Sequence, residues 1–395
     1  MTTSLDQTFP IERVRRDTPG VAEVIHFNNA GSALPPLVVV DTVVSHLHRE
    51  AAIGGYEASD EAHDRLEAVY QSIARLIGAQ PQQIATLENA TRAWDMAVYG
   101  YPFQPGDRVL TCRAEYSSNV IALLQLQKRH GLEIVLIDDD EFGQIDLTHL
   151  EQELARGATM LCMTHAPTSG GLINPAEEVG ALCNAYQTFF VLDACQSVGQ
   201  IPVDVQAIGC DVLSSTGRKF LRGPRGTGFL YVNERALERI EPPFLDLHSA
   251  AWTDDWEYEI RADARRFENW ETYYAGKLGL GAAVDYALEL SVDATAARLQ
   301  DLGAVLRSRL EGVSGVTVHD KGTQRGGIVT FGMVGQTAEQ IKDKLSAACI
   351  NTSTSTPNYA RFDLAHRGLP TVVRASVHYY NTEEEIDKFI EELDR

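Results

Sequence analysis

The sequence has few of the features that mark export, disulfide stapling or metal binding. Its 395 residues include six cysteines, with no Cys-x-x-Cys pair and no Cys/His cluster at zinc-site spacing. Disulfide frameworks are unusual in chains of this size, so we expect a reducing, cytoplasmic environment. No apolar run approaches the ~20 residues needed to span a bilayer, and residues 1–24 show no apolar signal segment. We therefore expect neither a bound metal nor membrane insertion.

Positive charge is also scarce. The chain has 34 Lys+Arg against 55 Asp+Glu, which gives a formal net charge of −21 at pH 7. A field of this sign repels nucleic-acid phosphates and anionic lipids, so we expect neither as a partner. The hydrophobic share of 44% and the charged share of 23% are ordinary for a globular protein, and the length suits two or three domains. Any anionic ligand must be held by a local positive site.

Short apolar runs alternate with helical patterns in the middle of the chain. This alternation is typical of an α/β layer with a mostly parallel sheet whose strands are covered on both faces. We expect strands at Arg108–Cys112, Glu133–Ile137, Thr159–Met163, Phe189–Leu192, Asp211–Ser214 and Gly228–Val232, with helices at Ser118–His130 and Pro175–Tyr186.

The pattern changes after about Gly276 and indicates a smaller α+β domain. We expect helices at Lys277–Glu289, Asp293–Leu310 and Ala338–Ala347, and strands at Thr317–His319, Gly327–Met333 and Thr371–Val377. Thr382 and Glu385 have the spacing of a capping box for a last helix. The predicted plan is an N-terminal segment of residues 1–24, a large domain of 25–280 and a small C-terminal domain of 281–395.

Lysine is the scarcest charged residue, with seven copies against 27 arginines. The single lysine between Lys128 and Lys277 is Lys219, which directly follows a predicted buried strand. A lysine at a strand end, among small hydroxyl residues, suits a Schiff-base amine. Its neighbours Thr216 and Arg218 suit a phosphate. A solvated loop lysine is the alternative interpretation.

The preceding predicted strand, Phe189–Leu192, is followed by a carboxylate, Asp193. The carboxyl ends of parallel strands are where α/β sheets bind ligands. Pyridoxal phosphate requires this pair of groups: a lysine for the imine, and a carboxylate that keeps the pyridine nitrogen protonated. Lys219 and Asp193 together therefore predict a pyridoxal-phosphate site, with a helix N-cap as the alternative role of Asp193.

Other segments fit the same cofactor. Ala90 and Thr91 open a helical pattern, so they suit a phosphate at a helix N-terminus, although a plain N-cap is the common alternative. Tyr116 follows a predicted strand and suits stacking on a flat ring, with an ordinary core tyrosine as the alternative. Arg374 lies in an otherwise apolar strand and needs an anionic partner, either a substrate carboxylate or a structural salt bridge.

Together these segments resemble the class V aminotransferase family of pyridoxal-phosphate enzymes, which includes cysteine desulfurases and C–S lyases. The resemblance extends from about His26 to Thr382, and its strongest block joins Val191–Ser197, Thr216–Lys219 and Gly226–Val232. It implies the α/β fold of type I pyridoxal-phosphate transferases, with a large domain on a mostly parallel mixed sheet and a smaller α+β domain. It also implies a homodimer with active sites at the subunit interface.

The resemblance also implies roles for individual residues. Lys219 forms the imine and moves protons, Asp193 holds the pyridine nitrogen, and Gln196 contacts the phenolic oxygen. Tyr116 stacks on the ring, and Arg374 grips the substrate α-carboxylate. The other cofactor positions are Ala90, Thr91, Thr168, Thr216, Arg218 and Thr272, and the other substrate positions are Asn28, Asn29, Ala30, Gly31 and Tyr56, the last reaching in from the partner subunit.

The chain departs from the desulfurases at three places. The loop that carries their persulfide-forming cysteine corresponds to Thr356–Tyr359, which has none, and Cys349 lies before it on a predicted strand. Thr168 stands where many relatives have asparagine. Glu271 stands where desulfurases place a phosphate-binding threonine from the second subunit, so either Thr272 replaces it or the contact is lost.

We therefore expect a C–S β-lyase of sulfur or secondary metabolism. It would cleave an S-substituted cysteine conjugate to thiol, pyruvate and ammonia, a reaction that needs no thiol nucleophile. Transamination, epimerisation and decarboxylating deamination use the same Lys219 and Asp193 and remain alternatives. Cysteine desulfuration is disfavoured by the missing loop cysteine. An inactive scaffold is the alternative outside the enzyme class, and the retained Lys219 and Arg374 argue against it.

Overall fold

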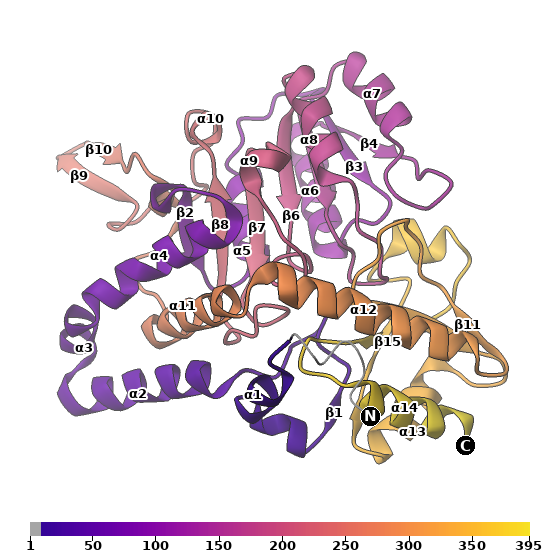
Figure 1. Ribbon diagram of the computed structural model, residues 1–395. Coiled ribbons are helices and arrows are strands. Elements are labelled where there is room, and N and C mark those ends of the chain that lie inside the picture. The colour runs from indigo at the N-terminus through magenta and orange to yellow at the C-terminus, as the bar shows by residue number, and fades with distance from the viewer. Residues whose placement is uncertain (1–8) are drawn as a thin grey trace.

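The computed structural model describes residues 9–395, so the first eight residues of the predicted N-terminal segment lie outside the described part. Within that range the chain forms a seven-stranded sheet, a four-stranded sheet and two two-stranded pairs, with helices around them (Figure 1).

The large sheet carries the predicted parallel core. Its strands are β2 (Ile84–Leu87), β3 (Arg108–Cys112), β4 (Glu133–Ile137), β5 (Met160–Thr164), β6 (Phe189–Asp193), β7 (Val212–Thr216) and β8 (Gly228–Val232). Their order in space is β2-β8-β7-β6-β5-β3-β4. β8 runs antiparallel to both of its neighbours, and the other pairs are parallel. The six predicted strands are all present, and the predicted α/β class with a mostly parallel mixed sheet is confirmed.

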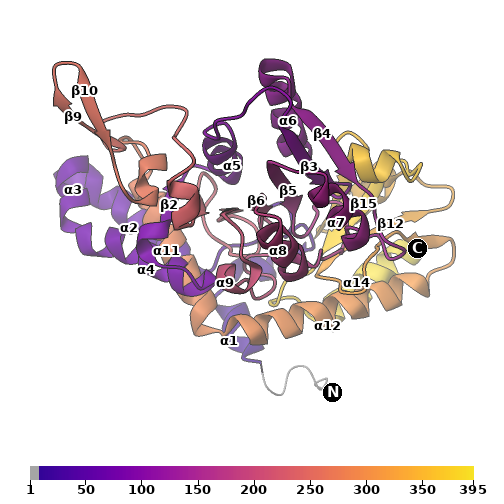
Figure 2. The ribbon, with the colours of Figure 1, turned by 90° about the horizontal axis from the view of Figure 1, so that it is seen from above.

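Helices cover both faces of this sheet (Figure 2). α5 (Ala90–Val98) and α6 (Ser117–His130) pack on one face, and α4 (His63–Ile77), α7 (Leu147–Ala155), α8 (Ala176–Ala185), α9 (Val205–Ile208) and α11 (Tyr274–Glu289) pack on the other. Along β6, Phe189 and Val191 face the first group, whereas Phe190 and Leu192 face the second. Because successive side chains of a strand point to opposite faces, a strand covered on both sides is apolar throughout.

The second sheet is formed by the C-terminal part of the chain. Its antiparallel strands lie in the order β11 (Val316–Val318), β12 (Ile328–Met333), β15 (Val372–Ser376) and β14 (Ser353–Ser355), with α12 (Val292–Glu311), α13 (Ala338–Ala347) and α14 (Glu383–Asp394) beside them. The predicted capping box of the last helix is present, since Thr382 and Glu385 each accept a hydrogen bond from the other's backbone N–H.

The N-terminal residues pack on this second sheet. α1 (Ile11–Arg16) leads to β1 (Ile25–His26), which pairs in parallel with β13 (Ile350–Asn351). Phe9 and Val14 are buried in the apolar core that the C-terminal strands share.

The predicted domain boundary at residue 280 falls within a continuous helix, α11. Leu280 and Val284 of this helix belong to the core under the large sheet, whereas Tyr286 belongs to the core of the second sheet. The division into residues 25–280 and 281–395 stays a prediction.

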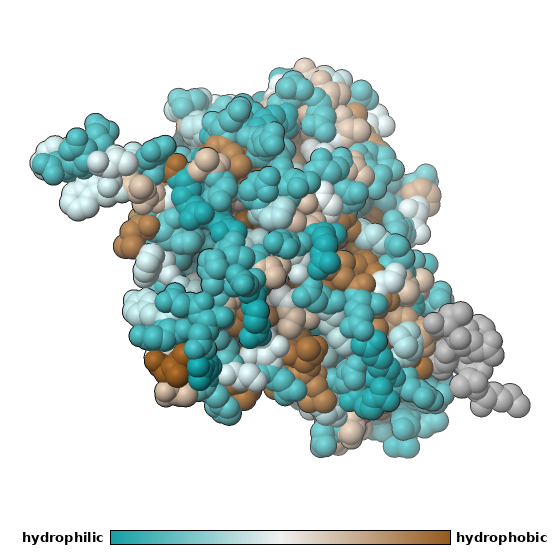
Figure 3. All heavy atoms as spheres, turned by 60° about the vertical axis from the view of Figure 1, so that its left-hand side comes forward, coloured by the Kyte–Doolittle hydropathy of each residue, from teal (hydrophilic) through white to brown (hydrophobic). Residues whose placement is uncertain are grey.

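The remaining elements lie outside the two larger sheets. They are α2 (Leu37–Ile53), α3 (Gly55–Glu61), α10 (Glu234–Leu237), short 3₁₀ turns at Pro19–Ala22, Pro81–Gln83 and Ala264–Phe267, and one π-helical turn at Arg361–Ala365. The hairpin of β9 (Ala250–Asp254) and β10 (Glu257–Ile260) projects from the body (Figures 1 and 3). Between residues 9 and 395, no helix is long and apolar enough to cross a membrane.

The strand order creates one crevice at the carboxyl ends of the large sheet. From β3 the chain moves outward to β4 and then returns to the other side of β3 to form β5. The helices that follow β3 and β5 cover opposite faces, so the loops above these two strands diverge. In open α/β sheets, ligands bind at such a point. The fold therefore places the predicted site residues after β3, β5, β6 and β7 around one opening.

A buried carboxylate ties the antiparallel edge of this sheet to its helices. Glu268 is buried. Its Oε1 accepts a hydrogen bond from Thr86 N on β2 (2.6 Å), and its Oε2 accepts one from Tyr70 Oη on α4 (2.8 Å) and lies 3.1 Å from His248 Nε2. Lys277 Nζ on α11 donates to the same tyrosine hydroxyl (2.5 Å). Burial alone raises the pKa of Glu268, but Lys277 and these hydrogen bonds together lower it to about 2.

We expect Glu268 to make the stability of the protein depend on pH. Its pKa is depressed below the ordinary 4.5, so it stabilises the folded state above about pH 4.5 by on the order of 3 kcal/mol, and this contribution is lost as the pH falls towards 2. Urea unfolding at a series of pH values measures it. Glu268→Gln should flatten the profile in that window, whereas the exposed Glu177→Gln on α8 should not. Parallel profiles for the wild type and Glu268→Gln would contradict this assignment.

Candidate active site

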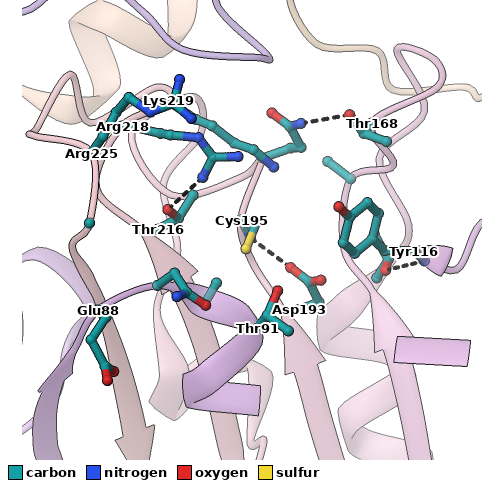
Figure 4. Close-up of a pocket in the computed structure, with 16 residues that line it drawn as sticks. Glu88, Thr91, Tyr116, Thr168, Asp193, Cys195, Thr216, Arg218, Lys219 and Arg225 are labelled. Carbon is teal, nitrogen blue, oxygen red and sulfur yellow. Dashed lines mark hydrogen bonds between the residues drawn. The ribbon is translucent and has the colours of Figure 1, made fainter. Parts of the chain in front are cut away.

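A cavity of about 420 Å³ opens at the carboxyl ends of β5, β6 and β7 (Figure 4). This volume is within the range of small-molecule sites. Nine of the ten residues predicted to hold the cofactor line it, namely Ala90, Thr91, Tyr116, Thr168, Asp193, Gln196, Thr216, Arg218 and Lys219. The topology therefore brings together residues from five separate segments of the chain.

One end of the cavity is the N-terminus of α5. Asn89 is its N-cap and accepts a hydrogen bond from the amide of the third helical residue (2.9 Å), which leaves the amides of Ala90 and Thr91 at the cavity. Gly228 on β8 permits this arrangement. A Cβ there would lie 2.9 Å from Asn89 C and 3.0 Å from Ala90 N, so only glycine lets β8 run against the start of the helix.

A guanidinium adds positive charge to the same end. Arg218 lines the cavity, and its Nη1 donates to Thr216 Oγ1 at the end of β7 (3.0 Å). Helix-terminal amides, the positive end of the helix dipole and an arginine side chain all favour a phosphate. This end of the cavity is therefore suited to a dianionic group, against the negative charge of the whole chain.

The opposite side carries a carboxylate and a ring. Asp193 is 5% exposed at the end of β6, and its Oδ1 accepts a hydrogen bond from Cys195 N (2.9 Å) while its Oδ2 accepts one from Asn119 Nδ2 (2.9 Å). Tyr116, at the start of α6, lies on the same side of the cavity (Figure 4). A buried negative charge beside an aromatic side chain suits a flat ring that carries a proton.

Lys219 follows the last residue of β7 by three positions and lines the cavity. Burial lowers the pKa of its amine, and the nearby Arg218 and Arg374 lower it further, although Asp193 acts in the opposite direction. A lysine whose pKa is lowered has a larger fraction of neutral amine, and the neutral amine is the nucleophile and base.

Arg374 on β15 reaches the edge of the cavity from the second sheet. Its Nη1 donates to Thr168 Oγ1 (2.6 Å), and its Nη2 donates to Asn28 Oδ1 (3.1 Å). Burial lowers its pKa to about 10, which leaves it protonated at neutral pH. Gly31 leaves room for this contact, because a Cβ there would lie 2.6 Å from Asn28 Oδ1. Thr168 also accepts a hydrogen bond from Gln196 Nε2 (3.1 Å), so it joins the arginine to the cavity floor.

Some predicted residues lie elsewhere. Tyr56 and Thr272 line a neighbouring cavity of about 650 Å³, and Tyr56 is 68% exposed. Asn29 is fully buried, its amide nitrogen donates to His26 O and Ser376 O, and its oxygen accepts from Tyr380 Oη, so its polar atoms are engaged within the protein. The backbone of Ala30, by contrast, accepts from Gln196 Nε2 (3.1 Å). The substrate roles predicted for these residues stay predictions.

The sequence pattern did not single out Arg225 as a site residue, yet it lines the cavity together with Glu88. Arg225 lies in a glycine-rich turn between β7 and β8, where the glycines alone predict a tight turn. The signal that could have identified Arg225 as a site residue was a positive charge in a turn close to the carboxyl ends of the strands. Cys349, predicted on a strand, instead precedes β13 in an exposed position with φ of 58°.

The family model for aminotransferase class-V matches residues 25–389. The chain belongs to this family. It is 30% identical to a cysteine desulfurase of Yersinia pestis over 98% of both chains. A solved cysteine desulfurase from Thermococcus onnurineus is 26% identical and superposes with a TM-score of 0.92 over 100% of this chain and 98% of that one. A cystine C–S lyase solved with cysteine persulfide, at 22% identity, shares the fold with a TM-score of 0.86 over 95% and 99% of the two chains.

Class V aminotransferases are pyridoxal-phosphate enzymes of fold type I, so the predicted family, fold and cofactor are confirmed. The side chains and amides that line the cavity also fit this cofactor, independently of the family match. Amides and Arg218 suit its phosphate, Asp193 suits its protonated ring nitrogen, and Lys219 suits its aldehyde. Gln196 Oε1 is buried without a hydrogen-bond partner among the described residues, which leaves it available to a bound group.

Proposed function

We propose that this protein is a pyridoxal-phosphate-dependent C–S β-lyase that converts an S-substituted cysteine and one water molecule into a thiol, pyruvate and ammonia. The state of its cysteines carries the proposal. All six lie within residues 9–395, and Cys195 is the one at the cavity. Burial, reinforced by Asp193, raises the pKa of the Cys195 thiol well above its ordinary value. A thiol in this state is a poor nucleophile, and β-elimination requires none.

The other thiols support the same proposal. Thr356–Tyr359, which follows β14, contains no cysteine. Cys349 is exposed before β13 and is not among the residues that line the cavity. A desulfurase must place a thiolate at the substrate sulfur, and neither segment offers one to the cavity.

The chain's own residues supply the steps of the elimination. Arg374 binds the substrate α-carboxylate through its guanidinium. Lys219 Nζ removes the α-proton and later delivers it to the departing sulfur. Asp193 keeps its negative charge towards the ring nitrogen of the cofactor. When bound, pyridoxal phosphate supplies the electron sink for the charge left at the α-carbon.

Cysteine desulfuration is the second candidate, because the curated relatives at 27–30% identity over nearly the whole chain are named cysteine desulfurases. The two reactions differ in their carbon product. A desulfurase leaves alanine from cysteine, whereas a β-lyase leaves pyruvate and ammonia.

The proposal is tested by a product assay. The cofactor-loaded protein is incubated with an S-alkyl cysteine, without a keto acid, and thiol, pyruvate and ammonia are quantified over many turnovers. We expect equal amounts of all three. A parallel reaction with free cysteine and a reductant is assayed for alanine and sulfide. Alanine from cysteine, with no pyruvate from the S-alkyl substrate, would overturn the proposal in favour of desulfuration. Conversion of the cofactor to its pyridoxamine form would overturn it in favour of transamination.

We further propose a homodimer with shared active sites. α2 exposes an apolar row whose members are each 40% to 46% exposed, namely Leu37, Val38, Val40, Val44 and Leu47. Figure 3, in which the left-hand side of Figure 1 comes forward, shows separate apolar areas on the surface. An exposed row of this kind is typical of a surface that another protein covers. Tyr56 and Thr272, which lie apart from the main cavity, would then serve the partner's site. A monomeric mass in sedimentation equilibrium would contradict this proposal.

A further inference from the structure

A second buried carboxyl group lies behind Asp193, and the proposed mechanism does not use it. Asn119 on α6 is 3% exposed, and its Nδ2 donates to Asp193 Oδ2 (2.9 Å) and to Glu115 Oε1 (2.8 Å). An amide nitrogen has two hydrogens, so each carboxyl receives one. Glu115 is itself 3% exposed, just before α6. One side-chain amide therefore joins two carboxyl groups that are both shielded from solvent.

Glu115 is held firmly at the divergence of β3 and β5. Its Oε1 also accepts hydrogen bonds from Tyr116 N (2.8 Å) and from Thr164 Oγ1 at the end of β5. Its Oε2 lies 3.4 Å from Thr111 Oγ1 on β3. The carboxyl group thus connects the ends of β3 and β5 to Asp193 on β6 through a single amide. Such a fully bonded polar network fixes the orientation of each member.

We propose that Asn119 and Glu115 are positioning residues that orient the Asp193 carboxylate and set the negative charge behind it. The inference rests on the proposed role of Asp193 at the ring nitrogen of the cofactor. Asn119 donates a hydrogen bond to Oδ2 of Asp193, while Cys195 N donates one to Oδ1. The two bonds together fix the plane of the carboxylate. Glu115 acts through charge, since an ionised Glu115 strengthens the hold of Asp193 on a proton.

The surroundings of Glu115 allow its charge to change near neutral pH. Burial and, after it, the charge of Asp193 raise the pKa of Glu115 to about 7, while the hydrogen bonds from Thr164, Asn119 and Tyr116 N oppose this. The other titratable groups that face it are Cys112 on β3 and Cys162 on β5. Burial raises the pKa of both thiols well above the ordinary value, so they stay neutral. Glu115 therefore changes its charge near neutral pH, while the two neighbouring thiols stay uncharged.

Glu115→Gln tests the role of this charge. The substitution keeps the size and the Oε1 acceptor but removes the ionisation. The absorbance spectrum of the bound cofactor is recorded between about pH 5 and 9 in the holoenzyme. We expect the wild-type spectrum to change in a step within this range as Glu115 ionises, and we expect Glu115→Gln to lack that step. The exposed Glu177→Gln should keep the step. A Glu115→Gln profile that superposes on the wild type would overturn the role of Glu115.

Asn119→Ala tests the bridge. Loss of a hydrogen bond to a charged group should weaken cofactor binding about 10-fold, and loss of a donor to Glu115 should move the spectral step to higher pH. The matched control is Asn184→Ala on α8, whose amide donates to a backbone oxygen at the surface (3.4 Å). Thermal unfolding of the cofactor-free variants checks that each remains folded. An unchanged dissociation constant and an unchanged midpoint in a folded Asn119→Ala variant would overturn the role of Asn119.

Asp193→Asn separates this inference from the function on which it rests. If Asp193→Asn leaves both the spectrum and the affinity for the cofactor unchanged, the proposed role of Asp193 fails and the inference fails with it. If Asp193→Asn alters both, while Glu115→Gln and Asn119→Ala alter neither, the role of Asp193 stands and only the positioning inference fails.

Discussion

Replacing Lys219 by alanine should abolish turnover, with a loss of at least about 10³-fold in the rate of pyruvate formation. Lys219 is the lysine at the cavity, and its lowered pKa provides a neutral amine at the sheet end. The variant removes the amine that we propose both holds the cofactor and takes the α-proton. The assay is pyruvate release from an S-alkyl cysteine under saturating cofactor. Lys128→Ala, at an exposed site on α6, is the control and should keep the wild-type rate.

Two further observations distinguish loss of the amine from loss of the fold. Lys219→Arg keeps a positive charge and a long side chain but offers no neutral amine near pH 7, so it should be as inactive as the alanine variant. A small primary amine added to Lys219→Ala should restore part of the rate, because the truncated side chain leaves space at the cavity. Full activity of Lys219→Ala would remove the basis of the assignment.

The strands of the large sheet could be predicted because their environment imposes a simple pattern. β3, β4 and β8 agree with the expected residue ranges, and β5, β6 and β7 differ by one or two residues at their ends. Phe189 to Leu192 contact helices on both faces, so no polar residue interrupts the run. A sheet covered on both sides thus leaves a clear trace in the sequence.

Elements without such an environment were not predicted. β2 is an exception, because it is buried on both faces like its neighbours, but it has four residues and ends two residues before the helix α5, so its period cannot be separated from the helical one. The β9–β10 hairpin projects into solvent, with Trp252 and Trp256 80% and 94% exposed, and no buried face imposes alternation on it. α2 turns an apolar row outward, which reverses the expected pattern of a surface helix.

The site could be predicted where chemistry lies at a strand end, and not where it depends on distant pairing. Asp193 and Lys219 follow recognisable strands, so their meeting at one sheet edge is a consequence of parallel topology. The contact of Asn119 with Asp193 joins residues 74 positions apart, and no local pattern encodes it. Glu115 and Asn119, four residues apart at the start of a helix, did carry a local signal, but only the fold shows that they lie behind Asp193.

Arg374→Ala should lower kcat/KM by about 10²- to 10³-fold, mainly through KM, because the charge-assisted, two-pronged contact that we propose to the substrate carboxylate is lost. Thr168 and Asn28 already hold the guanidinium in place, so little ordering is required when the substrate binds. Arg374→Lys keeps the positive charge without the planar guanidinium, so its kcat/KM should lie between those of the wild type and Arg374→Ala. The exposed Arg75→Ala on α4 serves as the control.

The carboxamide of the same S-alkyl cysteine locates the effect at the carboxylate. This analogue lacks the charge that we propose Arg374 binds, so we expect the wild type to prefer the acid strongly, and we expect the wild type and Arg374→Ala to use the carboxamide equally poorly. Equal loss on both substrates would mean that Arg374 supports only the structure around Thr168. A preference for the acid that survives in Arg374→Ala would place the carboxylate elsewhere, and the exposed Arg225 at the cavity edge would be the next residue to replace.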